Sequence, residues 1–325
     1  MLPNNYPLLF LCIFLATGFP FLASAKPNIL LIYTDDQGSI DAQCYGAGDL
    51  RTPAMDKLAR QGVRFTQMLA PAAVCSPSRA GLLSGRIPMR VGAPGNIYQD
   101  LPHPRDRYAA FLSSTDELIG QVLDHLEAAG KTGETVVVFQ SDHGHSVEER
   151  TFGGGGNSGP YRGHKFSLFE GGQRVPSIVS WPGTLPQGEV RDQFVTGCDW
   201  FPTLAQWASA RIPDDLHLDG KNIDPVIRSA DAPSPHSHFF WTQDFSGDKD
   251  ASWAVRAGDW KLLHRPLDTV DRFEKTPDYF LVNLVEDVGE RANLAPAKPA
   301  KLAELQGLAE EYKKSLLPDF QAARK

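Results

Sequence analysis

Two short apolar runs stand out along the chain, and each gives way abruptly to polar residues. They are residues 29–34 (ILLIYT) and residues 135–140 (TVVVFQ). Runs this short and rich in branched residues predict strands that are buried on both faces of a parallel sheet. Because helical patterns connect them, the chain shows the βαβ pattern of a doubly wound α/β sheet.

Helices are predicted between and after these strands. Residues 52–62 have a threonine cap, an early proline and a final glycine, which indicates a short helix. Ser114-Thr115-Asp116-Glu117 has capping-box spacing and opens an amphipathic pattern that stops at Gly130. We also expect strands over residues 63–69 and 177–181 and a helix led by an aspartate cap over residues 199–208.

The pattern changes near residue 235. Short apolar and aromatic runs at 238–241, 253–256, 260–263 and 279–282 alternate with turn residues, and residues 299–317 form an amphipathic pattern. We therefore expect an α/β domain over residues 26–234, with a proline-containing irregular connection at 87–110. A small antiparallel sheet with one helix would follow over residues 235–325.

The first 25 residues have the pattern of a secretory signal peptide. Residues 8–22 are almost uninterruptedly apolar, and Ala23-Ser24-Ala25 supplies small residues for cleavage before Lys26. The segment before the apolar run has no Lys or Arg, so a retained anchor is the alternative. No later run is apolar enough to span a bilayer, so we expect a secreted or periplasmic protein without a stable membrane span after cleavage.

Composition narrows the classes of partner. The chain has 325 residues and a net charge of -7, which argues against nucleic acid and against a polybasic membrane anchor. Four cysteines become three when Cys12 leaves with the signal peptide. Cys44 and Cys198 could pair in an oxidising compartment or remain as two buried thiols.

Acidic residues follow both predicted strands. Asp35-Asp36 comes directly after the first, and Ser141-Asp142-His143-Gly144 follows the second. Open α/β sheets bind ligands beyond the carboxyl ends of their strands. Neighbouring side chains on a strand point to opposite faces, so Asp35 and Asp36 converge only if the chain turns there, and Gln37-Gly38-Ser39 permits such a turn.

Cys75 lies at a predicted helix start. Pro77 suits the first helical turn, so Cys75 would stand where free N–H groups and the helix dipole favour negative charge. The alternative is an ordinary thiol in a loop. The glycine-rich residues 153–159 lack the Gly-Lys-Ser/Thr ending of a phosphate-binding loop, so we interpret them as a mobile surface loop.

Together these segments resemble the type I sulfatases of the alkaline-phosphatase-like superfamily. The resemblance covers nearly all of residues 27–325 and follows the family's order. It rests on Asp35-Asp36, Cys75-Ser76-Pro77-Ser78-Arg79 with Leu82-Leu83-Ser84-Gly85-Arg86, Ser141-Asp142-His143-Gly144, Lys165, Glu170-Gly171-Gly172-Gln173-Arg174-Val175-Pro176 and Gly258-Asp259-Trp260-Lys261-Leu262. It implies an alkaline-phosphatase-like α/β sandwich with a mostly parallel central sheet and a small C-terminal antiparallel subdomain.

The resemblance also implies a sulfuric ester hydrolase acting on a small-molecule or carbohydrate sulfate ester. In such enzymes a formylglycine-generating enzyme oxidises the cysteine, here Cys75, to an aldehyde that hydrates to a gem-diol. One hydroxyl attacks sulfur and the other then expels sulfate. Arg79 would steady the diol and Lys165 would contact the sulfate. The implied ligands of a Ca²⁺ ion, with Mg²⁺ or Mn²⁺ as alternatives because of the imidazole, are Asp35, Asp36, the converted Cys75, Asp142 and His143.

One family feature is missing. Residues 87–110 lead directly to the helix at Ser114 without the long section that carries a Gly-Lys-x-His-type motif, and no histidine of this chain follows a Gly-Lys pair. That motif's histidine and lysine serve the leaving-group side, and only His103 or Arg105 could substitute from the short connection. Two alternative functions therefore stay open. The chain could be an impaired, truncated homologue acting as a binding module, or a phosphodiester or phosphonate hydrolase of the same superfamily.

Overall fold

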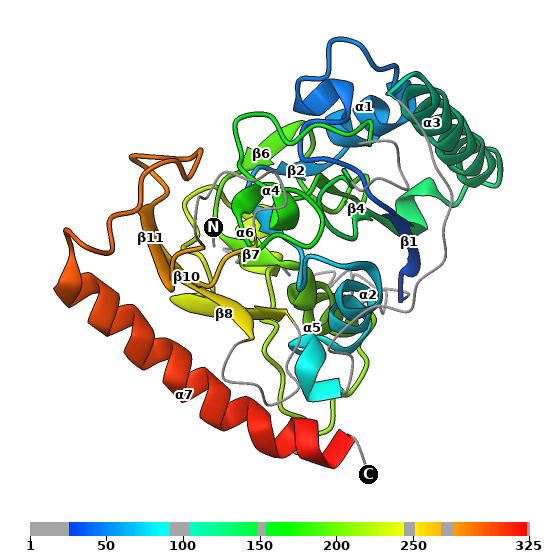
Figure 1. Cartoon of the computed structure of the whole chain (residues 1–325). Coiled ribbons are helices and arrows are strands. Elements are labelled where there is room, and N and C mark those ends of the chain that lie inside the picture. The colour runs from blue at the N-terminus through cyan, green and yellow to red at the C-terminus, as the bar shows by residue number, and fades with distance from the viewer. Residues whose placement is uncertain (1–25, 92–104, 148–153, 244–250, 268–275, 324–325) are drawn as a thin grey trace, which may run out of the picture.

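The structure is a computed structural model that describes residues 26–91, 105–147, 154–243, 251–267 and 276–323. Figure 1 shows a central sheet with helices on both sides, and a second sheet crossed by the long C-terminal helix. The strands are β1 (Asn28–Thr34), β2 (Val63–Phe65), β3 (Met68–Leu69), β4 (Thr135–Ser141), β5 (Ser177–Ser180), β6 (Glu189–Arg191), β7 (Val195–Thr196), β8 (His238–Gln243), β9 (Ser252–Ala257), β10 (Trp260–His264) and β11 (Tyr279–Asn283). The α-helices are α1 (Pro53–Arg60), α2 (Cys75–Ser84), α3 (Arg105–Ala128), α4 (Glu170–Gln173), α5 (Trp200–Trp207), α6 (Asp224–Arg228) and α7 (Pro299–Ala323). Short 3-10 helices are η1 (Gln43–Tyr45), η2 (Pro88–Val91), η3 (Thr132–Glu134) and η5 (Gly197–Asp199).

The central sheet has the strand order β1-β4-β5-β2-β6. β1 pairs in parallel with β4, and β2 with β6, while β5 runs antiparallel to both β4 and β2. Four of the five strands therefore share one direction, which confirms the expected mostly parallel sheet. Strand β4 is buried along its whole length, as its apolar sequence predicts. Strand β1 is the last strand at its end of the described sheet. Leu31 and Tyr33 pack against one core and Leu30 and Ile32 against the other, so β1 is covered on both faces, but less completely than expected.

The register of β1 against β4 brings the ends of the two strands together at the site. Thr34 is paired with Ser141, the last residue of each strand, and the N–H of Asp142 donates to the carbonyl of Thr34 at 3.0 Å. The residues that follow both strands therefore emerge side by side at the same edge of the sheet. This arrangement follows from parallel pairing, in which carboxyl ends lie together.

Alternate side chains of β4 pack into two separate hydrophobic cores. Val136 and Val138 pack with Phe65, Leu82 and Trp200 on the face covered by α2, α5 and α6. On the other face the intervening side chains of β4 pack with residues from α1 and α3, namely Val137, Phe139, Met55, Leu58, Leu112 and Ile119. This alternation is the period of two expected for a strand buried on both faces.

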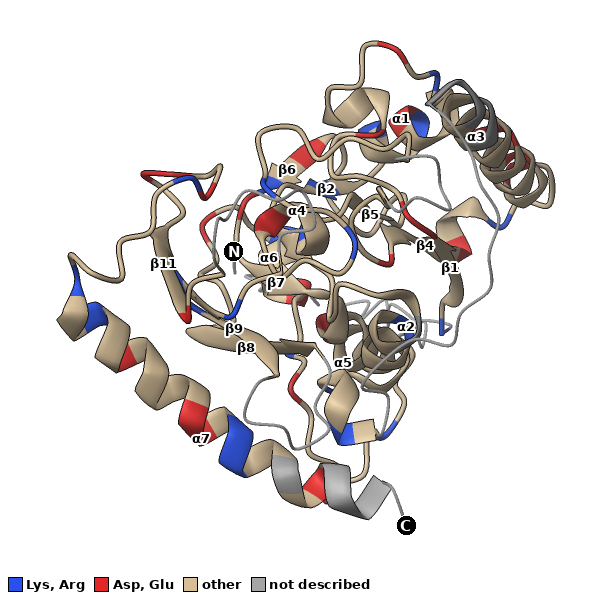
Figure 2. Cartoon of the chain, in the orientation of Figure 1, with Lys and Arg blue, Asp and Glu red and all other residues tan. Residues whose placement is uncertain are grey.

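The C-terminal part is an antiparallel sheet of order β11-β10-β9-β8 with α7 packed against it, as predicted from residue 235 onward. The hairpin turn between β9 and β10 contains Gly258 at φ +56°, which agrees with the predicted turn. Basic and acidic residues are interspersed along α7 (Figure 2), and Lys301 pairs with Glu304 at 2.6 Å. One apolar core joins this sheet to Leu69 and Phe169 of the preceding region, and the division at residues 234 and 235 stays a prediction.

Several predicted boundaries are corrected by the structure. Helix α3 begins at Arg105, so Ser114-Thr115-Asp116-Glu117 lies inside it and does not cap it. The predicted strand over residues 63–69 is split into β2 and β3, and α7 continues past residue 317 to Ala323. From residue 154 the glycine-rich segment is packed rather than mobile, because Asn157 N donates to Asp41 Oδ2 at 2.7 Å. Local sequence could not reveal these packing contacts.

The described part of the chain contains three cysteines. Cys44, Cys75 and Cys198 are free thiols, which settles the alternative for Cys44 and Cys198 in favour of unpaired cysteines. Across the described ranges, no helix combines the length and apolarity that crossing a bilayer requires. The predicted signal peptide, residues 1–25, lies outside the described residues.

Asp116 caps a neighbouring helix instead of its own. Its buried carboxylate accepts the N–H groups of Ala54 and Met55 at the start of α1, both at 2.9 Å. We expect Asp116→Ala to lower the free energy of unfolding by about 1–3 kcal/mol, because two N–H groups lose their acceptor. Urea denaturation of both proteins measures the difference.

Asp124→Ala is the matched control on the same helix, since Asp124 is 73% exposed and makes only a 3.6 Å ion pair with Lys57. We expect it to change stability by less than about 0.5 kcal/mol. Equal effects of the two substitutions would contradict the capping role of Asp116.

Candidate active site

The site lies where β1 and β4 end. Asp35 and Asp36 follow β1, and Asp142 and His143 follow β4. Asp36 has φ +54°, so the chain leaves the extended conformation between the two aspartates. This is the turn that the adjacent carboxylates need in order to face one site.

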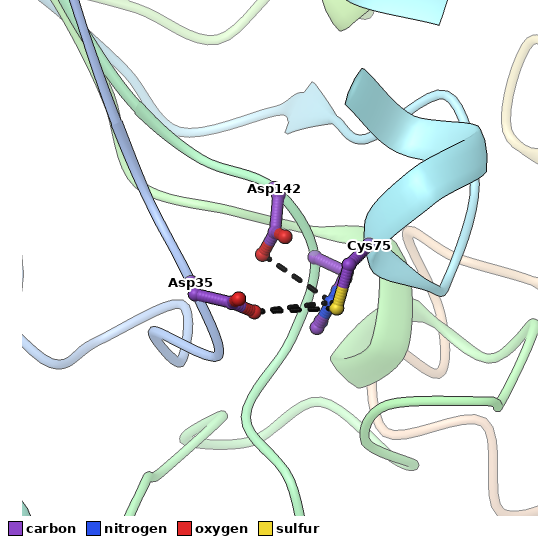
Figure 3. Close-up of side chains that lie close together, drawn as sticks. Asp35, Cys75 and Asp142 are labelled. Carbon is purple, nitrogen blue, oxygen red and sulfur yellow. Dashed lines mark hydrogen bonds and ion pairs between the residues drawn. The ribbon is translucent and has the colours of Figure 1, made fainter. Parts of the chain in front are cut away.

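Cys75 reaches the same place from another element. It is the first residue of α2, after Val74 in an extended conformation. Its Sγ lies 3.3 Å from Asp35 Oδ1 and 2.9 Å from His143 Nε2. Figure 3 shows the side chains of Asp35 and Asp142 directed toward the sulfur at the helix start.

Four of the predicted ligands form one group. One ligand atom from each of Asp35, Cys75, Asp142 and His143 lies within 4.8 Å of the other three. Asp36 is adjacent but turned toward Lys165, whose Nζ donates to Asp36 Oδ1 at 2.7 Å. The structure thus brings together all the predicted site residues that it describes, with Asp36 in a different orientation from the other acids.

The orientation of His143 defines what it can bind. The imidazole is fully buried, and its Nδ1 lies 2.8 Å from the carbonyl oxygen of Gly144. A carbonyl only accepts hydrogen bonds, so Nδ1 carries the proton and Nε2 presents a lone pair to the cluster. Burial lowers the pKa of His143, which favours this neutral form.

Two cations face the three carboxylates. Arg79, one turn along α2 from Cys75, lies 3.0 Å from Asp35 Oδ2 and 3.4 Å from Asp142 Oδ2. Lys165 is buried and pairs with Asp36. The balance is still unfavourable for Asp142, because its burial and then the charge of Asp35 raise its pKa to about 7.

The unmodified thiol is a poor nucleophile. Burial, followed by the negative charge of Asp142, raises the pKa of Cys75 to about 12. The thiolate is the reactive form of cysteine, so this thiol is almost entirely protonated at neutral pH.

Hydroxyl groups that sequence reasoning passed over support the ligands. Ser78 Oγ donates to the carbonyl of Asp142, and Tyr33 OH lies 3.3 Å from Ser78 Oγ. Ser141 Oγ accepts from Gln37 N at 3.2 Å and donates to the carbonyl of His143 at 3.0 Å. Ser78 and Ser141 stand inside the two motifs, which was the available signal, but only the fold shows what they contact.

The donor atoms fit a divalent cation. Asp142 Oδ1 and Asp35 Oδ1 lie 3.3 and 3.7 Å from His143 Nε2, and none of these three atoms carries a proton when the acids are ionised. Lone pairs that converge in this way repel one another unless a cation lies between them. Oxygen ligands with one imidazole are compatible with Ca²⁺, Mg²⁺ or Mn²⁺.

The substitutes suggested for the missing motif cannot be placed. His103 and the side chain of Arg105 lie outside the described residues. No leaving-group acid is therefore assigned among the residues that the structure describes.

Comparison with known proteins identifies the relatives of the chain. A family model described as Sulfatase matches residues 27–105 and 94–210, and one described as N-sulphoglucosamine sulphohydrolase, C-terminal, matches residues 161–314. The two sulfatase matches overlap at residues 94–105, within the connection that the sequence predicts to be shortened. Arylsulfatase A of Bos taurus is 24% identical, with 76% of each chain covered. Steryl-sulfatase of Rattus norvegicus is 38% identical over 41% of this chain and 24% of its own length.

Solved structures share the fold. Ps i-CgsB in complex with k-i-k-neocarrahexaose superposes with a TM-score of 0.75 at 20% identity, covering 90% of this chain and 93% of the other. Phosphonate monoester hydrolase of Agrobacterium radiobacter gives a TM-score of 0.63 at 17% identity, covering 90% and 96%. These likenesses confirm the predicted fold class.

Asp142→Asn should stabilise the metal-free protein in a pH-dependent way. The pKa of Asp142 is raised from 3.8 to about 7 on folding, so its stability contribution is present below pH 3.8 and lost as pH rises through 7. In chelator we expect Asn to raise the free energy of unfolding by about 2–4 kcal/mol at pH 8 and far less at pH 4. Thermal and urea unfolding at both pH values measure this gain.

Asp214→Asn serves as the control, because its carboxylate is 90% exposed. It should leave stability almost unchanged at either pH. A loss of stability in Asp142→Asn at pH 8, or the same gain at both pH values, would contradict the crowding of charge described here.

Proposed function

The chain belongs to the sulfatase family, and from this premise we propose that it is a metal-dependent sulfuric ester hydrolase with a formylglycine formed at Cys75. The single observation that carries the proposal is the convergence of Asp35, Cys75, Asp142 and His143 at the start of α2. Here the Sγ atom of Cys75 stands in for the hydroxyl oxygens of the hydrated aldehyde. In that position an oxygen would be surrounded by the same carboxylates and imidazole.

Asp35, Asp142 and His143 would hold the cation, and Asp36 would complete the site from the Lys165 side. When bound, the cation supplies positive charge that favours an ionised hydroxyl at neutral pH and attracts the sulfate group. His143 is oriented for this role by its Nδ1 hydrogen bond to Gly144. The α2 N-terminus adds the partial positive charge of its free N–H groups.

Arg79 and Lys165 have separate tasks in this proposal. Arg79 is 48% exposed and contacts Asp35 and Asp142, so it can hold the nucleophile's surroundings while meeting substrate from the solvent side. Lys165 is buried, and Asp36 holds its pKa above the usual value despite the opposing effect of burial. It therefore stays charged and can contact a sulfate oxygen as a point charge.

The proposed substrate is a small-molecule or carbohydrate sulfate ester. The carbohydrate choice is supported by the structural neighbour that was solved with neocarrahexaose. A formylglycine-generating enzyme is the required cellular partner, and we propose a secreted or periplasmic location from the predicted signal peptide.

Two other functions have specific support. A Gly-Lys-x-His motif, which would supply the proton donor for the leaving alcohol, is absent from the sequence. General acid catalysis typically raises the rate about 10²–10⁴-fold, so its loss favours an impaired homologue that acts as a binding module. The fold likeness to phosphonate monoester hydrolase favours phosphonate or phosphodiester substrates instead. The following measurements separate them.

Conversion of Cys75 is the first test. We expect the peptide containing residue 75 to carry an aldehyde when the protein is co-expressed with a formylglycine-generating enzyme, and mass spectrometry detects it. Cys44→Ala should leave the conversion unchanged, because Cys44 is outside the cluster. A free thiol at Cys75 after co-expression would refute the formylglycine assignment.

Turnover is the second test. Wild-type protein with Ca²⁺ should hydrolyse an aryl sulfate, and Cys75→Ala or chelation should lower kcat/KM by at least about 10³-fold. Calorimetric titration with Ca²⁺ shows separately whether the protein binds the cation. Complete conversion and Ca²⁺ binding without turnover would favour the binding module, and faster turnover of an aryl phosphonate would favour the phosphonate hydrolase.

A further inference from the structure

A buried group of charged side chains joins α4 to the C-terminal sheet. Lys261 on β10 places Nζ 2.9 Å from Glu170 Oε1 and 3.3 Å from Glu290 Oε1, and all three side chains are fully buried. Arg174 donates to the other Glu170 oxygen at 2.7 and 3.1 Å. A buried charge is tolerated only with good partners, so these contacts hold α4 in one place against β10.

The backbone of α4 is tied to the same region. Glu290 Oε2 accepts from Glu170 N at 2.6 Å, and the Glu290 carbonyl accepts from Arg162 at 2.7 Å. The Arg162 carbonyl in turn accepts from Gly171 N at 2.6 Å. Glu290 adopts φ +50°, an uncommon conformation for a residue other than glycine, with its side chain at the start of α4 and its carbonyl on Arg162.

Two segments, here called the arms of the active site, surround the ligands: one carries His143 and Gly144, the other Lys165. The first arm contacts α4. Gly144 N donates to the carbonyl of Gly172 at 3.0 Å. A Cβ at Gly144 would lie 1.9 Å from the carbonyl oxygen of Gly171, so the two backbones are in direct contact. Because His143 Nδ1 donates to the Gly144 carbonyl, the direction of the imidazole depends on this contact.

The other arm, the segment around Lys165, contacts Gly172 of the same helix. A Cβ at Gly172 would lie 2.1 Å from the Ser167 carbonyl oxygen and 2.5 Å from that of His164. Lys165 lies between those two residues, and its N–H donates to the His145 carbonyl at 2.9 Å. In Figure 1, α4 correspondingly lies between the central sheet and the C-terminal sheet.

We propose that Lys261 is a positioning residue for the active site: it pins α4 through Glu170 and Glu290, and α4 in turn sets the backbone under His143 and Lys165. The inference rests on the proposed function in one respect, namely that His143 holds a cation and Lys165 contacts sulfate. Lys261 itself touches no reacting atom. The C-terminal sheet is then a working part of the site, although it supplies none of the residues that contact the ligand.

The test uses a charge-balanced pair of substitutions, Lys261→Met with Glu290→Gln, in the full chain. Removing one positive and one negative group together avoids leaving an unpaired buried charge. We expect the Kd for Ca²⁺, measured by calorimetry, to rise about 10- to 100-fold, as is typical when the support of a metal ligand is lost. Amide hydrogen exchange should accelerate over residues 143–146 and 164–172.

A matched control removes an equally buried ion pair elsewhere. Arg90 Nε lies 2.8 Å from Asp219, their side chains are 2% and 6% exposed, and the pair contacts neither arm of the site. Arg90→Met with Asp219→Asn should lower the unfolding temperature without changing the Kd for Ca²⁺ or exchange at the two arms. Glu290→Gln alone is the milder variant if the double substitution does not fold, and a smaller change in the same direction is expected.

The outcomes distinguish this inference from the proposed function. If wild type binds Ca²⁺ without hydrolysing sulfate esters, the Kd and exchange results still test the positioning role. If wild type does not bind Ca²⁺, exchange at the two arms decides alone. Unchanged Kd and exchange in the 261/290 variant, or equal changes in the 90/219 control, would overturn the role of Lys261.

Discussion

The parallel pairing of β1 with β4 is the contact on which the site depends. Because Thr34 is paired with Ser141, the acidic segments that follow the two strands emerge at the same height on one sheet edge. The turn at Asp36, with φ +54°, then brings the carboxylates of Asp35 and Asp36 to that edge. Helix α2 begins at the same point and supplies Cys75, so three elements far apart in the chain meet at one sulfur atom.

This arrangement crowds negatively charged carboxylates together. Asp142 is fully buried beside another acid. Among the described residues, only Arg79 and Lys165 oppose the carboxylates of Asp35, Asp36 and Asp142 at short range. A cluster of this kind destabilises the folded chain on its own and becomes favourable when a cation is bound. Burial, together with the same negative surroundings, raises the pKa of the Cys75 thiol and keeps it protonated.

The site has a buried side, here called its floor, formed by Asp142 and His143, and a solvent-exposed side formed by Asp35 and Arg79. Asp142 and His143 have no exposed side-chain surface, whereas Asp35 is 52% and Arg79 48% exposed. Asp35 and Arg79 therefore form the solvent-facing side of the site, and Lys165 lies on its buried side. Behind the floor, Lys261 and its two glutamates hold α4, so the rigidity of the buried side comes from the C-terminal sheet.

The amino-acid sequence by itself indicated the order of the main elements and the candidate residues of the site. An apolar run such as that of β4 and a motif such as the one around Cys75 are local patterns, so they can be recognised in the sequence without knowledge of the fold. The tertiary structure decided what local patterns cannot contain. It placed β1 at the end of the described sheet, put the predicted capping box inside α3 and directed Asp116 of that motif to the start of α1. It also aimed Asp36 at Lys165 and set Lys261 between Glu170 and Glu290. Each of these depends on a partner tens of residues away, and the pairing of distant groups is settled only when the chain packs.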